Sequence, residues 1–532
     1  MVYKTLLDFT TDELLFSLLA KERAKYRKRN RHVRYHDLHK DCDISNFPNR
    51  IKLSRMTPPR IKWVRPSKRK KLSKVTLTSR RIAEKAMKLT YKKDICNHSE
   101  LDYQKEFKAF AARIRERLQS DELHFDTPQL TPLYKDTKKV DGKTIVTCRP
   151  LSVYMNLEDK IILALTSRYL TQYLDKCLHP HILSYRKARR FDDNSYRPID
   201  FNDGIKMIMK YLDDHNENSI YAADCDIKKF YDIIDHQVVR DCFSRILCQS
   251  RIPSEGQSQV MRVMDAYLAS YNFYDNVLIA AQQNPKVFSK IWRKVKDSKH
   301  QNKYEYVFGW VDELKQMKVE EQRQRGVPQG GALSLLVANI VLNDVDQAII
   351  ATEDPERLFI RYCDDMILLH TDKKQCNCLM NHYTQSLTAH KLYYHDFESY
   401  NDRKGFWHIK SHRPYLWGDG DIDSSNRYIG FLGYELRRDG RLRLRKSNIE
   451  KLKERFMRQV YIHRRYVKTL EIKDAKERTQ KAFDKYLDCT SVYTGFNKDQ
   501  FEKGGQYAYL CQLKKKFEAR LRISSSPSAT SD

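Results

Sequence analysis

The chain has 532 residues, of which 41% are hydrophobic and 11% aromatic, and its formal net charge at pH 7 is +30. This composition excludes a fibrous or low-complexity protein, and without a run of 18 apolar residues no transmembrane helix or membrane partner is expected. The 12 cysteines are scattered and form no CxxC pair, so we expect a reducing, cytoplasmic location and no zinc-finger framework.

The positive charge is concentrated towards the two ends of the chain. Residues 1–100 carry a net charge of +17 and residues 441–520 a net charge of +12, whereas all the others together carry +1. Residues 51–80 alone hold 11 lysines and arginines and no acid. Such a field attracts polyanions, so nucleic acid is the expected partner. A basic surface that is merely solvated is the alternative.

The first hundred residues are predicted to be mainly helical. Thr10-x-x-Glu13 is a capping box, and the leucines that follow it lie on one helical face. Residues 31–75 are rich in proline and basic side chains, which predicts irregular structure. Residues 78–120 show helical spacing of apolar side chains again.

The body of the chain alternates short apolar strands with helices, which predicts an α+β fold. After it, Ser447-x-x-Glu450 is a second capping box, and the stripe that follows predicts a basic helical region. The predicted divisions are a basic N-terminal extension (1–127), the α+β body (128–440) with an insertion at about 270–322, a helical basic region (441–522) and a disordered tail (523–532).

Three segments of the body carry the chemistry. A short apolar strand ends at Asp226, and two apolar runs flank Asp364 and Asp365 as in a β-hairpin with carboxylates at its tip. A glycine-rich stretch, Arg325–Gly331, precedes a long apolar helix. Each signal alone also fits an ordinary turn or loop.

Together the three segments fit phosphoryl transfer to a 3′-hydroxyl. That reaction uses two divalent ions held by carboxylates from different strands, one ion acting on the attacking hydroxyl and the other on the triphosphate. Hard oxygen ligands suit Mg²⁺, with Mn²⁺ as a substitute. Asp226 and Asp364 are the predicted bridging ligands, and Asp365 supports them.

These segments resemble the sequence blocks of reverse transcriptases. Tyr362-Cys363-Asp364-Asp365 is similar to the family's Tyr-x-Asp-Asp box, and the segment 226–236 to its first catalytic block. Three further blocks are similar to a fingers block, the block beneath the incoming nucleotide and the primer-grip hairpin: 149–161, 325–334 and 429–436. The resemblance covers about residues 130–500 and implies a right-hand polymerase fold with fingers, palm and thumb.

The resemblance also implies roles in nucleotide binding. Tyr231 takes the place of the aromatic residue that lies beneath the sugar and excludes a 2′-hydroxyl, with a core aromatic as the alternative. Arg149, together with Lys143 or Lys139, is expected to hold the triphosphate. Gln329 is expected to contact the nucleotide sugar.

A general-acid lysine is expected near the catalytic aspartates, and Lys404 and Lys410 are both candidates. The stretch between His236 and Gly326 is longer than a minimal palm needs, which is why an insertion is predicted there.

The residues of these blocks most resemble those of bacterial reverse transcriptases related to group II intron proteins. With no DNA-binding or nuclease region visible after the predicted thumb, the chain most resembles the defence-associated, unknown-group enzymes. That resemblance implies a structured non-coding RNA as template or scaffold, dNTPs as substrates, a DNA product and a role against phage, with a homo-oligomer left open.

A template-independent, abortive-infection-type polymerase and an intron maturase that only binds RNA are the alternatives. The primer is open between an RNA end, a 2′-hydroxyl and a tyrosine such as Tyr507.

Overall fold

A computed structural model of the protein describes residues 5–26, 48–64, 66, 79–96, 100–140, 143–190, 196–197, 199, 201–280, 304–308, 312–397, 409–418, 428–440, 442–445, 450, 512 and 516.

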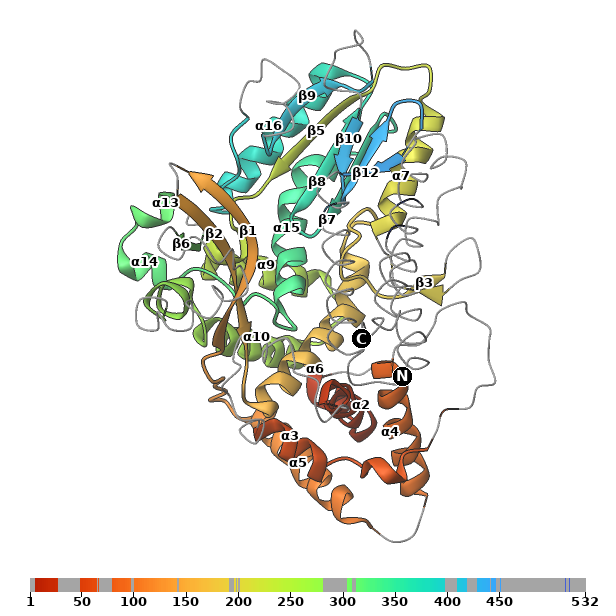
Figure 1. Ribbon diagram of the computed structural model, residues 1–532, viewed down its shortest axis with the longest axis vertical. Coiled ribbons are helices and arrows are strands. Elements are labelled where there is room, and N and C mark those ends of the chain that lie inside the picture. Colours follow the sequence, from red (N-terminus) through yellow and green to blue (C-terminus); the bar gives the residue numbers. More distant parts are fainter. Residues whose placement is uncertain are drawn as a thin grey trace, which may run out of the picture.

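The N-terminal part folds as a group of helices around an apolar core. Its helices are α1 (Leu6–Phe9), α2 (Asp12–Arg23), α3 (Pro48–Arg55), α4 (Ser79–Ile95) and α5 (Asp102–Gln119), with 3-10 turns at Ala24–Tyr26 and Arg60–Lys62. Phe16 of α2 stacks on Tyr91 with 3.8 Å between ring centroids, and Phe107 meets both rings edge-on. The group packs onto α6 (Leu157–Leu174) and α10 (Ser254–Ala269), at the lower end of Figure 1.

The cap of the first long helix differs from the prediction. Thr11 begins α2, and its hydroxyl accepts the N–H of Leu14 at 3.3 Å. Thr10 instead ends α1, and its hydroxyl donates to the carbonyl of Leu6 at 2.8 Å. The preceding short helix, which the sequence pattern did not reveal, therefore takes the threonine that was predicted as the cap.

The prediction of irregular structure over residues 31–75 is wrong for part of that range. Helix α3 begins at Pro48, a residue whose fixed φ and missing N–H suit the first helical position. Pro48 thus marks a helix start and does not exclude a helix. The helical prediction for residues 78–120 is confirmed as two helices, α4 and α5.

A four-stranded antiparallel sheet forms the centre of the body. Its strands are β5 (Tyr221–Asp226), β7 (Arg357–Tyr362), β8 (Asp365–His370) and β9 (His412–Leu416), in the spatial order β7-β8-β5-β9. β7 and β8 form the predicted hairpin, joined by a two-residue turn. β8 also pairs with β5, so Asp226 lies opposite Asp365.

Both faces of this sheet are buried, which explains why β8 is apolar along nearly its whole length. On one face, Met366 and Leu368 join a core with α9 (His236–Gln249), α15 (Ser334–Ile350) and α16 (Lys373–Ala389). On the other, Ile367 and Leu369 join a second core with α7 (Phe201–Asp214) and with β10 (Tyr428–Phe431) and β11 (Tyr434–Arg437). Because strand side chains alternate, Asp365 faces this second side.

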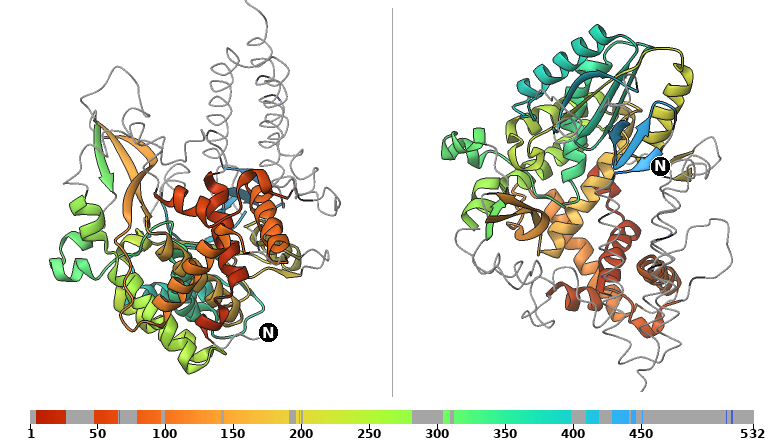
Figure 2. Two further views of the ribbon diagram at one scale, coloured as in Figure 1. Left: turned by 90° about the horizontal axis from the view of Figure 1, so that it is seen from below. Right: turned by 45° about the horizontal axis from the view of Figure 1, so that its top comes forward.

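Smaller sheets flank the centre. The long hairpin of β1 (Gln129–Val140) and β2 (Lys143–Val153) is extended by the parallel strand β6 (Tyr304–Phe308). In Figures 1 and 2 this ribbon lies beside α13 (Asp312–Lys315) and α14 (Val319–Arg323), on the opposite side of the body from β10 and β11. The remaining elements are β3 (Arg189–Arg190), β4 (Tyr196–Arg197), β12 (Leu442–Leu444), α8 (Phe230–Ile233), a 3-10 turn at Asp175–Cys177 and a π-helix at Tyr274–Ile279.

The architecture confirms a mixed α+β fold with an antiparallel sheet. Nearly all of the predicted helical region 441–522, with its capping box at Ser447, and the tail 523–532 lie outside the described residues. No helix in the described part of the chain is both long and apolar enough to span a membrane.

Candidate active site

Three carboxylates meet at one end of the central sheet. Asp226 is the last residue of β5, Asp365 is the first residue of β8, and the two are partners across the antiparallel ladder. Asp364 precedes Asp365 in the turn that joins β7 to β8. The sheet thus brings together the acids that the sequence places in two distant segments.

The carboxylates interact electrostatically. The side chain of Asp365 has an exposed surface, but many protein atoms surround its carboxylate. The resulting desolvation is the main cause that raises the pKa of Asp365 to about 7. The charges of Asp224, Asp364 and Asp226 raise that pKa further, whereas Arg445, directly after β12, lowers it. Clustered carboxylates disfavour one another's charged forms, and a bound cation would stabilise those charged forms.

The donor set fits a hard divalent cation, because every group that it offers is a carboxylate oxygen, the kind of ligand that Mg²⁺ prefers. The oxygen atoms of the three carboxylates do not all lie within 4.8 Å of one another. Among the described residues, the trio of metal-ligating atoms that lie within 4.8 Å of one another is instead that of Cys242, Asp344 and His390.

That other trio is a poor site for a metal ion. Arg245 donates to Asp344 at 2.7 Å, and its guanidinium also lies 3.3 Å from the sulfur of Cys242. A cation therefore already neutralises the carboxylate. Burial raises the pKa of the Cys242 thiol to about 12, so it stays protonated. The aspartates at the sheet end remain the better candidate metal site in the described structure.

Two basic side chains lie beside Asp226. The Nζ atom of Lys410 is 3.7 Å and Nε2 of His395 is 3.8 Å from Oδ2 of Asp226. Lys410 also donates to His395 at 2.9 Å, and burial followed by the charge of Lys410 lowers the pKa of His395 to about 4. The imidazole ring of His395 is therefore neutral at neutral pH. Lys404, the other candidate acid, lies outside the described residues.

Tyr231 lies on α8, the short helix that follows β5. Its ring meets Phe230 edge-on, with 5.3 Å between the centroids, and its buried hydroxyl has no hydrogen-bond partner among the described residues. Burial raises the pKa of Tyr231 well above its usual value, and the nearby Cys363 and Asp364 add to this effect. The ring therefore lies close to the hairpin turn that carries Asp364.

The glycine-rich segment Arg325–Gly331 docks beside this site. Gly330 has a φ of +89°, and a Cβ atom there would lie 2.4 Å from Cδ1 of Leu151. Only glycine fits such a position. The side-chain amide of Gln329 donates to Asp232 at 2.6 Å. Its predicted contact with the nucleotide sugar thus competes with an internal partner, and it stays a prediction.

The predicted triphosphate ligands lie on the β1–β2 hairpin. Arg149 is opposite Leu133 and has an exposed side chain, whereas Lys143 is the first residue of β2, next to the hairpin turn. The two positions are about 20 Å apart along an extended strand. The strand therefore separates them widely. The side chains of Lys143 and Lys139 are outside the described part of the structure.

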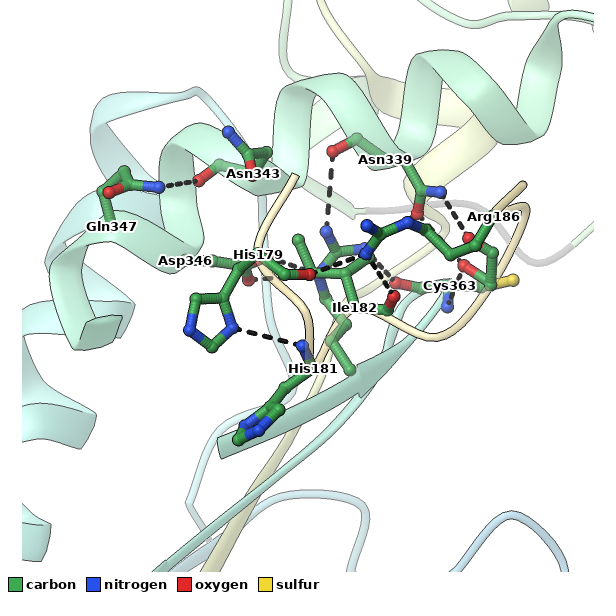
Figure 3. Close-up of polar contacts among 11 residues, drawn as sticks. His179, His181, Ile182, Arg186, Asn339, Asn343, Asp346, Gln347 and Cys363 are labelled. Atoms are coloured by element: carbon green, nitrogen blue, oxygen red, sulfur yellow. Dashed lines mark hydrogen bonds and ion pairs between the residues drawn. The ribbon is translucent and has the colours of Figure 1, made fainter. Parts of the chain in front are cut away.

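The sequence analysis missed the support behind the hairpin turn. Arg361 of β7 is fully buried and pairs with the equally buried Asp346 of α15 at 2.8 Å. Figure 3 shows Asn339 of α15 near the turn residue Cys363, with Asp346 farther along the same helix. The available signal was an arginine inside an otherwise apolar strand, which usually requires a buried partner.

Comparison with known proteins agrees with the resemblance seen in the sequence blocks. Residues 137–396 match a family model described as reverse transcriptase (RNA-dependent DNA polymerase). A search of curated proteins found no match.

Among solved structures, the chain is similar to apo telomerase from Candida tropicalis truncated from its C-terminal domain. That match has 13% identity and a TM-score of 0.34, and it covers 60% of this chain and 55% of that one. Telomerase from Candida albicans in complex with a TWJ fragment of telomeric RNA gives 12% identity and a TM-score of 0.32, and the match covers 84% and 69%. This chain spans about half the length of the first of these. By this match, residues 137–396 are similar to a reverse transcriptase (RNA-dependent DNA polymerase) domain.

Proposed function

We propose that the chain copies an RNA template into DNA from dNTPs, with Asp226, Asp364 and Asp365 holding two Mg²⁺ ions, or Mn²⁺ in their place. The observation that carries this proposal is the pairing of Asp226 with Asp365 beside the Asp364 turn. In the right-hand arrangement that we infer, the central sheet is the palm, β1–β2–β6 belong to the fingers, β10–β12 form the primer grip and residues 441–522 the thumb.

The ions, when bound to these oxygens, would lower the pKa of the primer hydroxyl and neutralise charge on the triphosphate. The residues of the chain do the rest. The ladder between β5 and β8 holds Asp226 and Asp365 in register on one face of the sheet. Tyr231 offers a ring beside Asp364 on which a deoxyribose can rest. Lys410, which lies 3.7 Å from Oδ2 of Asp226 and beside a neutral His395, is the group that can give a proton to the leaving pyrophosphate.

A primer-extension assay tests this function. The purified protein should extend a primer on a defined RNA template with dNTPs and Mg²⁺, and the product sequence should be complementary to the template. Digesting the RNA beforehand should stop synthesis. Synthesis that continues without RNA would instead identify a template-independent polymerase, and no synthesis with intact RNA binding would identify an RNA-binding protein of the maturase kind.

Replacing Lys410 with methionine should lower kcat about a hundredfold, the usual contribution of a general acid. The KM for dNTP should change little, because the lysine lies beside Asp226 and acts on the leaving group. Single-turnover extension measures the effect. Lys391→Met is the matched control, since Lys391 pairs with Asp235 instead. Equal rates in the two variants would remove Lys410 from the reaction.

Replacing Tyr231 with valine should weaken the discrimination of dNTPs over rNTPs about 10- to 100-fold, the range expected for one steric contact in a pocket. The bulk of the ring, and not its hydroxyl, would block a ribose 2′-hydroxyl. Tyr231→Phe, which keeps the ring, should therefore keep the discrimination. The ratio of kcat/KM for dCTP and CTP gives the answer, and an unchanged ratio in the valine variant would make Tyr231 a core residue only.

The N-terminal extension is proposed to hold RNA. Residues 48–64 contain no acid, and among the side chains described there, those with exposed positive charge are Lys52, Arg55, Arg60 and Lys62. Changing these four to alanine should reduce the slope of log K against log salt by about 0.7 for each phosphate that is no longer neutralised. Filter binding at several salt concentrations measures the slope. Neutralising Lys373 and Lys374, exposed at the start of α16, should leave it unchanged.

We further propose the finer identity that the sequence blocks favour: a bacterial enzyme of the group II intron-like lineage, cytoplasmic, acting with a structured non-coding RNA in defence against phage. Sequencing the nucleic acid that co-purifies with the protein tests it. Recovery of one structured RNA with its DNA copy supports the proposal, whereas recovery of random cellular RNA contradicts it.

A further inference from the structure

The turn that carries Asp364 has an unfavourable backbone conformation. Cys363 has a φ of +59°, in the left-handed region that a residue with a Cβ atom rarely adopts. Residues in such conformations persist when the surrounding structure fixes them, and they are frequent at functional sites. What fixes Cys363 therefore also fixes its neighbour Asp364.

Both main-chain polar groups of Cys363 are held by buried side chains. Its N–H donates to the hydroxyl of Ser184 at 3.0 Å, and its carbonyl accepts Nη1 of Arg361 at 2.8 Å. Ser184 is 2% exposed and Arg361 is 0% exposed. The turn is thus clamped from both sides by groups that water does not reach.

These two side chains are themselves joined through α15. Oδ1 of Asn339 accepts the hydroxyl of Ser184 at 3.0 Å and Nη1 of Arg361 at 3.3 Å. Nδ2 of Asn339 donates to the carbonyl of Ser184 at 2.7 Å. Nε of Arg361 donates to both oxygens of Asp346, at 2.8 and 3.0 Å. The result is a connected set of hydrogen bonds, the turn support, formed by Ser184, Asn339, Asp346 and Arg361. Figure 3 labels Asn339 and Asp346 of this set.

The chain that precedes Ser184 is fastened to the hairpin as well. The N–H of Leu183 donates to the carbonyl of Arg361 at 2.9 Å, and the N–H of Arg361 donates to the carbonyl of His181 at 3.2 Å. Arg186 then ties this segment together through the carbonyls of His179 and Ile182, at 2.7 and 2.8 Å. Ser184 therefore sits on a rigid segment along the edge strand β7.

The turn support lies on the other side of the sheet from the carboxylates. Arg361 is the ladder partner of Met366, whose side chain packs in the core under α15, whereas Asp365 faces the opposite side with Ile367. The support therefore acts on the carboxylates through the turn. Groups that orient metal ligands from behind in this way commonly change metal affinity or activity 10- to 100-fold when they are removed.

We infer that Ser184, Asn339 and the Arg361–Asp346 pair are positioning residues, which hold the left-handed Cys363 and thereby set Asp364 and Asp365 against Asp226. This inference rests on the proposed function, because it assigns the support to the same metal-binding carboxylates.

The test uses Ser184→Ala, which removes one hydroxyl from the clamp and adds no bulk. The matched control is Thr166→Val, since Thr166 is also fully buried and its hydroxyl donates within α6, to the carbonyl of Ile162 at 2.9 Å. Binding of Mn²⁺ to the full-length protein, without nucleotide or nucleic acid, is followed by electron paramagnetic resonance. Hydrogen exchange of the 358–370 segment and primer extension are measured on the same samples.

In Ser184→Ala we expect Mn²⁺ affinity and kcat to fall about 10- to 100-fold and exchange at the turn to accelerate, with the KM for dNTP little changed. Thr166→Val should match the wild type in all of these. Wild-type Mn²⁺ binding and exchange in Ser184→Ala would overturn the inference, and so would equal losses in both variants. Asp364→Asn in the same titration distinguishes a failure of the proposed metal site from a failure of the positioning role. If it binds Mn²⁺ like the wild type, the proposed metal site is wrong. If it loses binding while Ser184→Ala does not, only the positioning role is wrong.

Discussion

Changing Asp364 and Asp365 together to alanine should reduce DNA synthesis to below about 1% of the wild-type rate, a loss of at least ~2.7 kcal/mol of transition-state stabilisation. The variant removes two of the three carboxylates at the sheet end, so the proposed ions lose most of their ligands. Folding should be unaffected, because desolvation and the neighbouring acids already disfavour the charge on Asp365. Primer extension with a radiolabelled primer measures the rate, and circular dichroism and RNA binding check the fold.

A paired-aspartate control is available in the same chain. Asp213 and Asp214 are exposed at the C-terminal end of α7, where negative charge opposes the helix dipole. Their replacement by alanine makes the same change of charge and should leave synthesis intact. Synthesis above about 1% in the Asp364/Asp365 variant would contradict the metal assignment, since a two-ion mechanism does not tolerate the loss of these ligands.

The local parts of the site could be predicted from the sequence because each is encoded within a few residues. Two apolar runs around an acidic pair indicate a hairpin, and an acid after an apolar run indicates a strand end. β7, β8 and β5 confirm both predictions. The register that sets Asp226 opposite Asp365 could not be read from the residue pattern, because it depends on pairing between segments far apart in the chain.

The turn support could not be predicted from the residue pattern for a different reason. An arginine inside an apolar strand indicates a buried partner but does not identify it, and an aspartate late in a helix normally indicates an exposed side chain. Arg361 and Asp346 are instead buried against each other, so each residue is explained only by the other. The structure places Lys410 beside Asp226, whereas Lys404 lies outside the described residues, so the choice between the two lysines stays a prediction. The roles of Arg149, Lys143, Tyr231 and Gln329 in nucleotide binding stay predictions.

The pair of Arg361 and Asp346 gives the largest expected effect on stability. Asp346→Ala should lower the free energy of unfolding by about 3–5 kcal/mol, because it leaves a guanidinium charge buried without a counter-charge. Both side chains are 0% exposed, so water cannot compensate the loss. Urea denaturation at pH 7.5 measures the change as a shift in the midpoint. Asp265→Ala, which breaks the exposed pair of Arg240 and Asp265, should cost only about 0–1 kcal/mol.

A double variant separates the stabilising role of the pair from its effect on the turn. Arg361→Met combined with Asp346→Leu removes both charges and keeps apolar volume, so its stability should return to within about 1 kcal/mol of the wild type. DNA synthesis should stay low, because the carbonyl of Cys363 and Oδ1 of Asn339 still lack the arginine that bonded to them. A double variant that is both stable and fully active would show that the pair only fills the core. If the single variant Asp346→Ala is as stable as the wild type, Arg361 has found another partner. The predicted cost of an unpaired buried charge would then be wrong.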